Sequence, residues 1–408
     1  MTGRIGIASA SLFATFVALA YAGSKSTANN GTNAIPAQAV LIDLPSLAVL
    51  GADGTFRQDE AALFNPTNTT PPFFQVSDQR FLALLGSNAS IRAVASNVSF
   101  AFAHEAPIWV PETDELFFAS NTNGLGDNVK IGMISLRDVD RAVTASNSTT
   151  SALNVSVIEL NLPDTIQVAN GGTGPFRGNL LFATSGMGSS PPSVALVNPH
   201  PPNNVTILLD NYFGRQFNSL NDIKVHPKNG KIFFTDTTYG FLSHFRPEPL
   251  MRNQVYRFDP DTRGVRVVAD GYLRPNGIAF SGDGKIAYVT DTGLAGGFLG
   301  NNQTDPATIY QYDIDPVTDQ FLNRRVFAFI DTGIPDGIQV DVQGNVYAGC
   351  GDGVHVWAPD STLLGKFFLG TTSANMAFAG PGRLMINAEN AIFMARIAAH
   401  GLDLASFT

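Results

Sequence analysis

The chain has 408 residues, of which 44% are hydrophobic and 14% are charged, and its formal net charge is −9. This composition is typical of a folded protein with a large core and argues against a disordered chain. The net negative charge argues against nucleic acid as a partner, because phosphates bind to basic surfaces, and it also disfavours anionic membrane surfaces.

The N-terminus has the pattern of a secretory signal. Arg4 precedes a long apolar run, and "AYA" at 20–22 has the small-x-small pattern of a cleavage site. We expect residues 1–22 to be a signal peptide, with an uncleaved signal anchor as the alternative, and residues 23–408 to form the mature domain. N-x-S/T sequons follow at Asn30, Asn68, Asn88, Asn97, Asn147, Asn154, Asn204 and Asn302. The sequence therefore predicts a secreted, extracellular glycoprotein without membrane attachment after signal removal.

Six similar hairpin patterns follow in chain order. In most of them, alternating apolar residues lead into a Gly- or Asp-containing turn and then into a second apolar run. They span residues 104–120, 174–186, 221–237, 276–292, 336–351 and 375–389. The second runs begin at Leu116, Leu180, Ile232, Ile286, Val346 and Leu384, with gaps of 64, 52, 54, 60 and 38 residues. This repetition predicts an all-β fold, a six-bladed β-propeller, whereas the alternative of a large β-sandwich does not account for six similar units.

Two further expectations concern the rest of the chain. The segment 36–100, which contains "AVLIDLP", should supply a closing strand to the blade that it shares with the C-terminus. No stretch with helical periodicity is evident after the signal, so we expect no sizeable helix there.

A polar residue precedes the first strand of most units at a matching position. Counting back ten or eleven residues from the starts of the second runs gives Glu105, Asn170, Asn221, Asn276 and Asp336. The innermost strands of a propeller surround a channel, so these residues should form a ring at one mouth of it. Carboxylate and amide oxygens favour Ca²⁺, with Zn²⁺ or Mg²⁺ as alternatives. The competing interpretation is that the "NG" and "DG" pairs only form turns.

Three of these segments resemble a known family. "FNSLNDIKVHPKNGKIFFTDTTYGF" (217–241), "RPNGIAFSGDGKIAYVTDTG" (274–293) and "PDGIQVDVQGNVYAGCGDGVHVW" (335–357) are similar to the gluconolactonase/senescence-marker-protein/luciferin-regenerating family. Within it, "HEAP" at 104–107 resembles secreted fungal lactonohydrolases. The resemblance covers about residues 100–390 and implies a six-bladed propeller with a divalent metal, usually Ca²⁺, at the channel mouth. By position, it implies metal ligands at Glu105, Asn221, Asn276 and Asp336, and it implies that Asp336 is the catalytic residue.

Substrate contacts are predicted from the ring and from one loop. The loop "DTTYGFLSHFRPEP" (236–249) should overhang the mouth and bring Tyr239, His244 and Arg246 to the substrate, with Asn170 contributing from the ring. His104 should point away from Glu105, since side chains alternate along a strand.

The leading functional hypothesis is a secreted, metal-dependent lactonase acting on aldonolactones such as gluconolactone. The metal would polarise the lactone carbonyl, and Asp336 would act as both ligand and general base. The alternatives are a phosphotriesterase-like hydrolase on the same ring and a non-catalytic propeller that binds a partner. The expected partner is a small-molecule lactone, and the oligomeric state stays open.

Overall fold

The computed structural model describes residues 35–122 and 126–402. The expected signal peptide (residues 1–22), its boundary with the mature domain and the sequon at Asn30 lie outside the described residues. Within the described ranges, no helix is long and apolar enough to cross a membrane.

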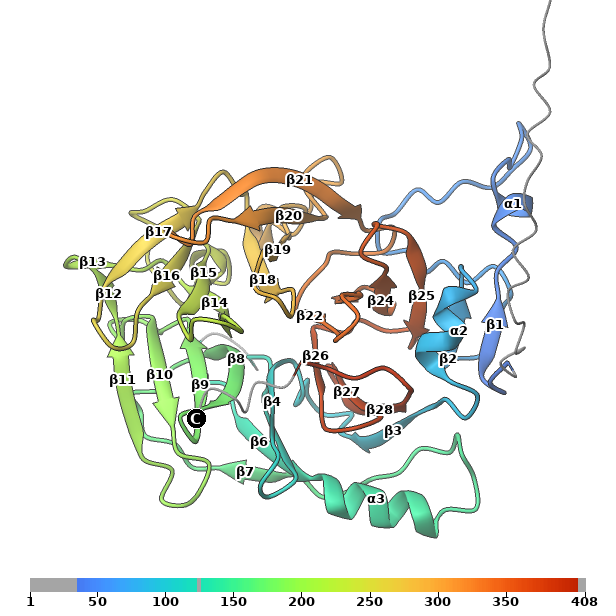
Figure 1. Ribbon diagram of the computed structural model, residues 1–408, viewed down its shortest axis with the longest axis horizontal. Helices are drawn as coiled ribbons and strands as arrows, with labels where there is room; N and C mark the ends of the chain where they lie inside the picture. The colour runs from blue at the N-terminus through green and yellow to red at the C-terminus, as the bar shows by residue number, and fades with distance from the viewer. Residues whose placement is uncertain (1–34, 123–125, 403–408) are drawn as a thin grey trace, which may run out of the picture. The chain divides into compact units, whose positions relative to one another are not determined.

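Six sheets are arranged around a central axis, which confirms the predicted six-bladed propeller (Figure 1). The first three blades consist of β4 (Glu105–Val110), β5 (Glu115–Ala119), β6 (Ile131–Ser135) and β7 (Ile158–Leu160); β8 (Ala169–Phe176), β9 (Asn179–Thr184), β10 (Ser193–Val197) and β11 (Val205–Leu209); and β14 (Leu220–Val225), β15 (Ile232–Asp236), β16 (Gln254–Phe258) and β17 (Val265–Ala269). In each blade, the first strand is the innermost.

The last three blades complete the ring. They consist of β18 (Pro275–Phe280), β19 (Ile286–Asp291), β20 (Thr308–Ile314) and β21 (Phe321–Phe329); β22 (Ile338–Val340), β23 (Val346–Cys350), β24 (Gly353–Trp357) and β25 (Leu363–Phe368); and β26 (Asn375–Phe378), β27 (Arg383–Ala388), β28 (Ala391–Arg396) and β3 (Ser90–Ser96). All six predicted starts of second runs lie in the second strand of a blade.

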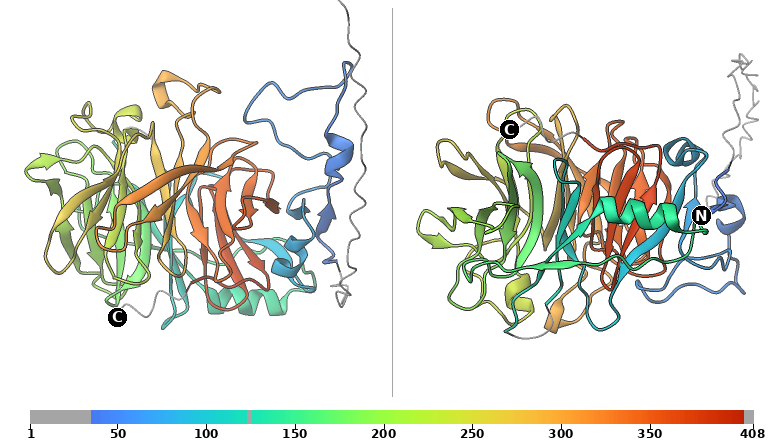
Figure 2. Two further views of the ribbon diagram at one scale, coloured as in Figure 1. Left: turned by 45° about the horizontal axis from the view of Figure 1, so that its top comes forward. Right: turned by 90° about the horizontal axis from the view of Figure 1, so that it is seen from below.

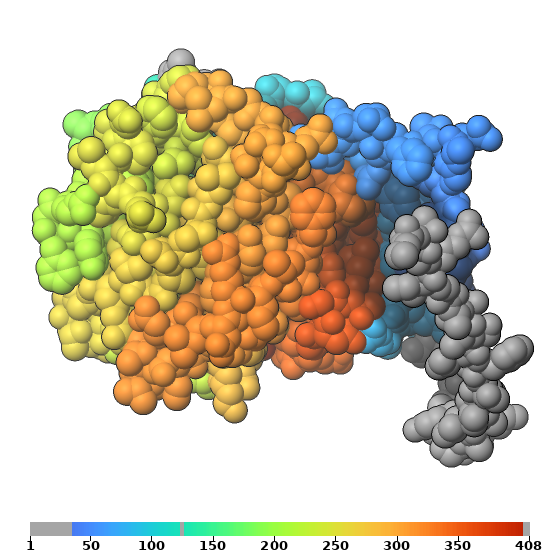
Figure 3. Space-filling view, turned by 90° about the horizontal axis from the view of Figure 1, so that it is seen from above, coloured from blue at the N-terminus to red at the C-terminus, as the bar shows by residue number. Residues whose placement is uncertain are grey.

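The ring closes where the two ends of the propeller meet. β3 pairs antiparallel with β28, so a strand from the N-terminal segment completes the C-terminal blade, as predicted. The stretch "AVLIDLP" does not form the closing strand. Its first residues form β1 (Ala39–Leu41), which runs parallel to β2 (Phe73–Val76), and β2 extends the edge of the fifth blade by pairing with β25. Figure 3 shows this N-terminal segment in blue beside the orange and red outer strands.

A buried apolar layer lies between each pair of neighbouring blades, giving six layers in the described part of the chain. Strand alternation supplies both faces of each blade. Phe233 and Phe234 are consecutive in β15, yet Phe233 packs toward the fourth blade and Phe234 toward the second. A blade buried on both faces explains why the sequence shows continuous apolar runs instead of a polar outer face.

Glycines in the inner strands permit neighbouring blades to approach closely. A Cβ on Gly277 would lie 2.3 Å from the carbonyl oxygen of Asp336, and one on Gly337 would lie 2.2 Å from the Asn375 side chain. Neither glycine has a positive φ. The alternative interpretation of the "NG" and "DG" pairs as turn formers is therefore wrong at these positions. The glycines are required because there is no room for a side chain.

The expectation of no sizeable helix is also wrong. α3 (Leu136–Ala145) follows β6 directly, with the Ser135 hydroxyl accepting a hydrogen bond from the Asp138 backbone N–H at its start. Leu136 and Val139 are buried against the first blade. The other helices are short: α1 (Leu44–Leu47), α2 (Arg80–Leu85), α4 (Tyr239–Leu242) and the 3₁₀ turn η1 (Gly297–Leu299). A small hairpin of β12 (Asn211–Tyr212) and β13 (Arg215–Gln216) precedes the third blade. Figure 2 shows α3 lying along the side of the propeller.

Gly277→Ala should destabilise the protein, because a methyl group has no space between the fourth and fifth blades. We expect a loss of about 1–3 kcal/mol in the free energy of unfolding, measured by denaturant titration. Gly264→Ala is the matched control, since Gly264 is exposed and its Cβ would meet only the Thr262 hydroxyl at 3.3 Å. Equal stability of the two variants would contradict the steric explanation.

Candidate metal centre and active site

The inner strands present polar side chains to one mouth of the channel through a recurring bulge. The register of the first two strands of a blade shifts after Glu105, Ala169, Leu220 and Pro275. An irregularity of this kind re-aims side chains locally. The polar residues at the bulge therefore face the axis, while the next apolar residues of the same strands return to the layers between blades.

The five predicted ring residues line one cavity of about 200 Å³. Glu105, Asn170, Asn221, Asn276 and Asp336 come from five different blades, and Tyr239 contributes to the wall. Ligand atoms of Glu105, Asp336 and His104 all lie within 4.8 Å of one another. The predicted convergence of the two carboxylates is thus confirmed by the geometry.

The expectation that His104 points away from Glu105 is wrong. His104 precedes β4, where the neighbouring residue Ala103 forms an isolated bridge with Glu389 instead of a regular strand pairing. Strict alternation does not hold at this point, and a ring nitrogen of His104 joins the two carboxylates. Its Nδ1 lies 2.6 Å from Oε1 of Glu389, so a third carboxylate orients the imidazole ring.

Glu105 is buried, and Asp336 beside it is partly buried. Burial raises the pKa of Glu105 well above its ordinary value, and the nearby charges of Asp336 and Asp222 raise it further. Burial also raises the pKa of Asp336 to about 6, although His104 opposes this shift. Without a compensating cation, the folded protein therefore favours protonation of this pair.

The comparisons with known proteins agree with this geometry. Residues 104–388 match the model of the SMP-30/gluconolactonase/LRE-like region. The chain belongs to this family. It is 30% identical over 338 residues to the lactonohydrolase OryL of Aspergillus oryzae, covering 77% of this chain and 73% of that protein. It is 31% identical over 208 residues to a gluconolactonase of Zymomonas mobilis, covering 48% and 55% of the two chains.

A solved structure supports the fold of this family member. A gluconolactonase from Xanthomonas campestris superposes with a TM-score of 0.60 at 23% identity, covering 84% of this chain and all of that one. At that level of identity the similarity establishes the propeller architecture, and the site must be argued from the residues themselves.

The donor atoms at the mouth fit a divalent cation. Oδ1 of Asn221 and Oδ1 of Asn276 are buried and have no hydrogen-bond partner among the described residues. An unpaired buried carbonyl costs free energy unless something binds it. Together with the carboxylates of Glu105 and Asp336, they make a mainly oxygen donor set with two negative charges. This set suits Ca²⁺, which takes six to eight oxygens, including water.

Asn375, from the sixth blade, is a ring residue that the sequence analysis missed. Its Nδ2 donates to Oε2 of Glu105 at 2.8 Å, and its Oδ1 accepts from the Met376 N–H. Its polar atoms are therefore used in orienting Glu105. A signal was available, since Asn375 begins the sixth hairpin, nine residues before Leu384 instead of ten or eleven.

A belt of hydrogen bonds between blades fixes the backbone of the ring. The hydroxyl of Thr235 donates to the carbonyl of Asn276, and that of Thr290 donates to the carbonyl of Asp336. In the sixth blade, Nδ2 of Asn387 donates to the carbonyl of Glu105. Each ring residue involved is thus held by the second strand of the preceding blade.

The predicted substrate residues divide into two groups. Asn170 and Tyr239 line the cavity; Nδ2 of Asn170 donates to the carbonyl of Asn221, and the Tyr239 hydroxyl bonds to that of Thr292. His244 is exposed and stacks on Phe298, outside the cavity lining.

Arg246 also lies outside the cavity lining. It is buried and donates to the carbonyls of Gly188 and Ser190, so its guanidinium stabilises a loop. The geometry gives neither Arg246 nor His244 the substrate contact expected from the sequence. The polar side chains of Ser120, Asn121 and Ser243 line the cavity instead.

Protonation of the Glu105–Asp336 pair should increase the free energy of unfolding of the cation-free protein when the pH falls from 7.5 to 5.5. The folded-state pKa of Asp336 is raised above the unfolded value of about 3.9, so the destabilising charge is present above about pH 6 and is lost as protons bind. At pH 7.5, Ca²⁺ should raise the melting temperature by at least about 2 °C. The increase should shrink at pH 5.5, because protons compete for the same oxygens.

Differential scanning fluorimetry in EDTA and in CaCl₂ at both pH values measures these shifts. The double variant Glu105→Gln/Asp336→Asn is the control and should lose the response to Ca²⁺. A response that is equal at both pH values and survives in the double variant would place the cation elsewhere.

Proposed function

We propose that this protein is a secreted lactonase that depends on a divalent metal, for which the donor chemistry favours Ca²⁺, and that opens aldonolactone-type rings. The observation that carries the proposal is the convergence on one small cavity of the carboxylates of Glu105 and Asp336 and of two amide oxygens that have no partner among the described residues. The names of the relatives, a lactonohydrolase and a gluconolactonase, support the reaction class.

Glu105, Asn221, Asn276 and Asp336 would hold the cation. When bound, a divalent cation supplies positive charge that polarises a lactone carbonyl. The Asp336 carboxylate would accept a proton from the attacking water as the new C–O bond forms. That proton then passes to the ring oxygen when the ester C–O bond breaks, so the product is a hydroxy acid. Asn375 keeps the Glu105 carboxylate in position through its 2.8 Å hydrogen bond.

The remaining cavity wall would orient the substrate. Asn170, Tyr239 and Asn121 offer hydrogen-bonding groups, while Val129 and Ile334 offer apolar surface. A volume of about 200 Å³ is suited to a small ring and leaves little space for a bulky ester. Hydroxylated lactones would pair with the polar side of this wall.

Export and glycosylation belong to the same proposal. Of the seven sequon asparagines in the described ranges, six are exposed and Asn97 is half-buried. Exposure is what glycan attachment requires. Intact-mass measurement of secreted protein before and after glycosidase treatment tests this part independently of activity.

A substrate panel with and without chelator tests the reaction. The purified protein should hydrolyse gluconolactone in a pH-stat assay, lose the activity in EDTA and regain it on addition of Ca²⁺. Paraoxon, a phosphotriester, should react much more slowly. Hydrolysis of paraoxon without hydrolysis of any lactone would favour the phosphotriesterase alternative, and no hydrolysis of either would favour a binding propeller.

Asp336→Asn tests the double role of Asp336 as ligand and base. The substitution keeps an oxygen donor but removes a charge and the ability to accept a proton. We expect kcat to stay reduced by about 10² to 10⁴-fold at saturating Ca²⁺. Glu105→Gln removes the same charge from the same ring, and excess Ca²⁺ should substantially restore its activity.

Metal occupancy of both variants must be confirmed by calorimetry before the values of kcat are compared. Equal restoration of activity by Ca²⁺ in the two variants would exclude Asp336 as the general base. The search would then move to His104, which lies beside the carboxylate pair and is oriented by Glu389, instead of to the distant His244.

A further inference from the structure

A second cavity, of about 480 Å³, lies at the mouth of the channel opposite the candidate metal centre. Inner strands from all six blades contribute to its lining. β14 connects the two sites: Asn221 lines the first cavity, and Lys224 lines the second. Three residues of strand span about 10 Å, so the two cavities are separate positions along one channel.

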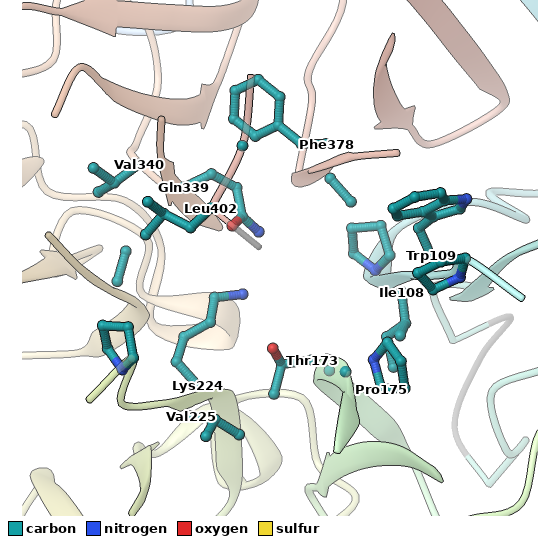
Figure 4. A pocket seen from close by; sticks show the side chains of 18 of the residues that line it. Ile108, Trp109, Thr173, Pro175, Lys224, Val225, Gln339, Val340, Phe378 and Leu402 are labelled. Carbon is teal, nitrogen blue, oxygen red and sulfur yellow. The ribbon is translucent and has the colours of Figure 1, made fainter. Parts of the chain in front are cut away.

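Lys224 is the charged lysine of this cavity, and it has no hydrogen-bonding partner among the residues that the structure describes. It is only 7% exposed, yet it forms no ion pair or hydrogen bond with the described residues. Figure 4 shows its amine extending into the open space toward Gln339 and Thr173. A largely enclosed ammonium group that lacks a hydrogen-bonded counter-charge is costly, and an anionic ligand would compensate for it.

The nearest carboxylate along the same strand is already engaged. Both oxygens of Asp222 accept backbone hydrogen bonds, Oδ1 from Ile223 and Oδ2 from Ile278. Lys224 lowers the pKa of Asp222 against the effect of burial, so the two charges interact at a distance without forming an ion pair. The donor hydrogens of the ammonium group remain available to a ligand.

Two further polar groups surround the amine. Thr173 is a buried residue whose hydroxyl lines the cavity and makes no hydrogen bond with the described residues, so it can donate to a carboxylate. Nε2 of Gln339 donates to the carbonyl of Met376 at 3.0 Å, which leaves its Oε1 as an acceptor. With one cation and two neutral groups, the site is better suited to a ligand with a single negative charge than to a phosphate dianion.

The rest of the wall is apolar. Trp109, Phe378, Phe280 and Leu402 line the cavity together with several prolines. Cavities of 300–1,000 Å³ with apolar walls and a few convergent polar groups are typical of small-molecule sites. A ligand that fits both the polar groups around Lys224 and the apolar wall has a carboxylate at one end and a hydrocarbon body at the other.

We propose that this mouth of the channel is a second binding site that takes an amphipathic monocarboxylate, with its carboxylate on Lys224 and Thr173 and its hydrocarbon part against Trp109 and Phe378. The site is independent of the proposed lactonase reaction, because it shares no residue with the cavity of Glu105 and Asp336.

Isothermal titration calorimetry with octanoate and its uncharged analogue octanamide tests the proposal on the wild-type protein. Octanoate should bind at least tenfold more tightly than octanamide, with or without EDTA. Equal affinities, or no binding of octanoate at millimolar concentration, would overturn the proposal. Octanoate binding that disappears in EDTA would place the carboxylate on the metal and would also overturn it.

Lys224→Met removes the charge while keeping a long apolar side chain. It should weaken octanoate binding at least tenfold and change octanamide binding less than twofold. Lys228→Met is the matched control, because it removes an exposed charge from the same hairpin and should leave both affinities unchanged.

If Lys224→Met does not fold, Thr173→Val provides the second test. It should weaken octanoate binding about three- to tenfold through loss of one hydrogen bond. An unchanged affinity for octanoate in either variant would exclude the proposed contacts.

Discussion

The burial of Glu105 beside Asp336 is the constraint on which the described architecture of this site depends. Two carboxylates whose oxygens lie within 4.8 Å repel one another, and burial strengthens the repulsion. The fold tolerates this arrangement because six blades converge there and hold the strand ends from all sides. A bound divalent cation would attract both carboxylates and offset their mutual repulsion. The electrostatically most unfavourable part of the site is therefore also the best candidate for the catalytic centre.

Three devices hold the strand ends, and each of them recurs in several blades. A bulge aims the polar side chain at the axis, a glycine permits the next blade to approach, and a threonine hydroxyl holds the neighbouring carbonyl. In the fourth blade these roles fall to Asn276, Gly277 and Thr290. Since each contact crosses from one blade to the next, the position of a ligand is determined by the closed ring and not by its own strand.

The two mouths of the channel differ in charge. One mouth gathers the carboxylates of Glu105 and Asp336, and the other carries the ammonium group of Lys224. Asp222 lies between them in the sequence of β14, with both oxygens bound to backbone N–H groups. The channel is therefore polarised along its axis, so cations are favoured at one end and anions at the other.

The sequence by itself determined the repeat, the blade number and the five ring residues, because a strand period of two and a fixed distance to the second strand are local properties. It also placed Glu105 and Asp336 together through their equivalent positions. It could not place His104, since this residue precedes β4, next to an isolated bridge at Ala103, and the alternation used to predict its direction does not hold there. Only the tertiary structure decided that Asn375 orients Glu105, that Arg246 serves a loop and that Lys224 faces an open cavity. Those outcomes depend on contacts between segments far apart in the chain, and no local pattern encodes which partner a buried polar atom will find when the ring closes.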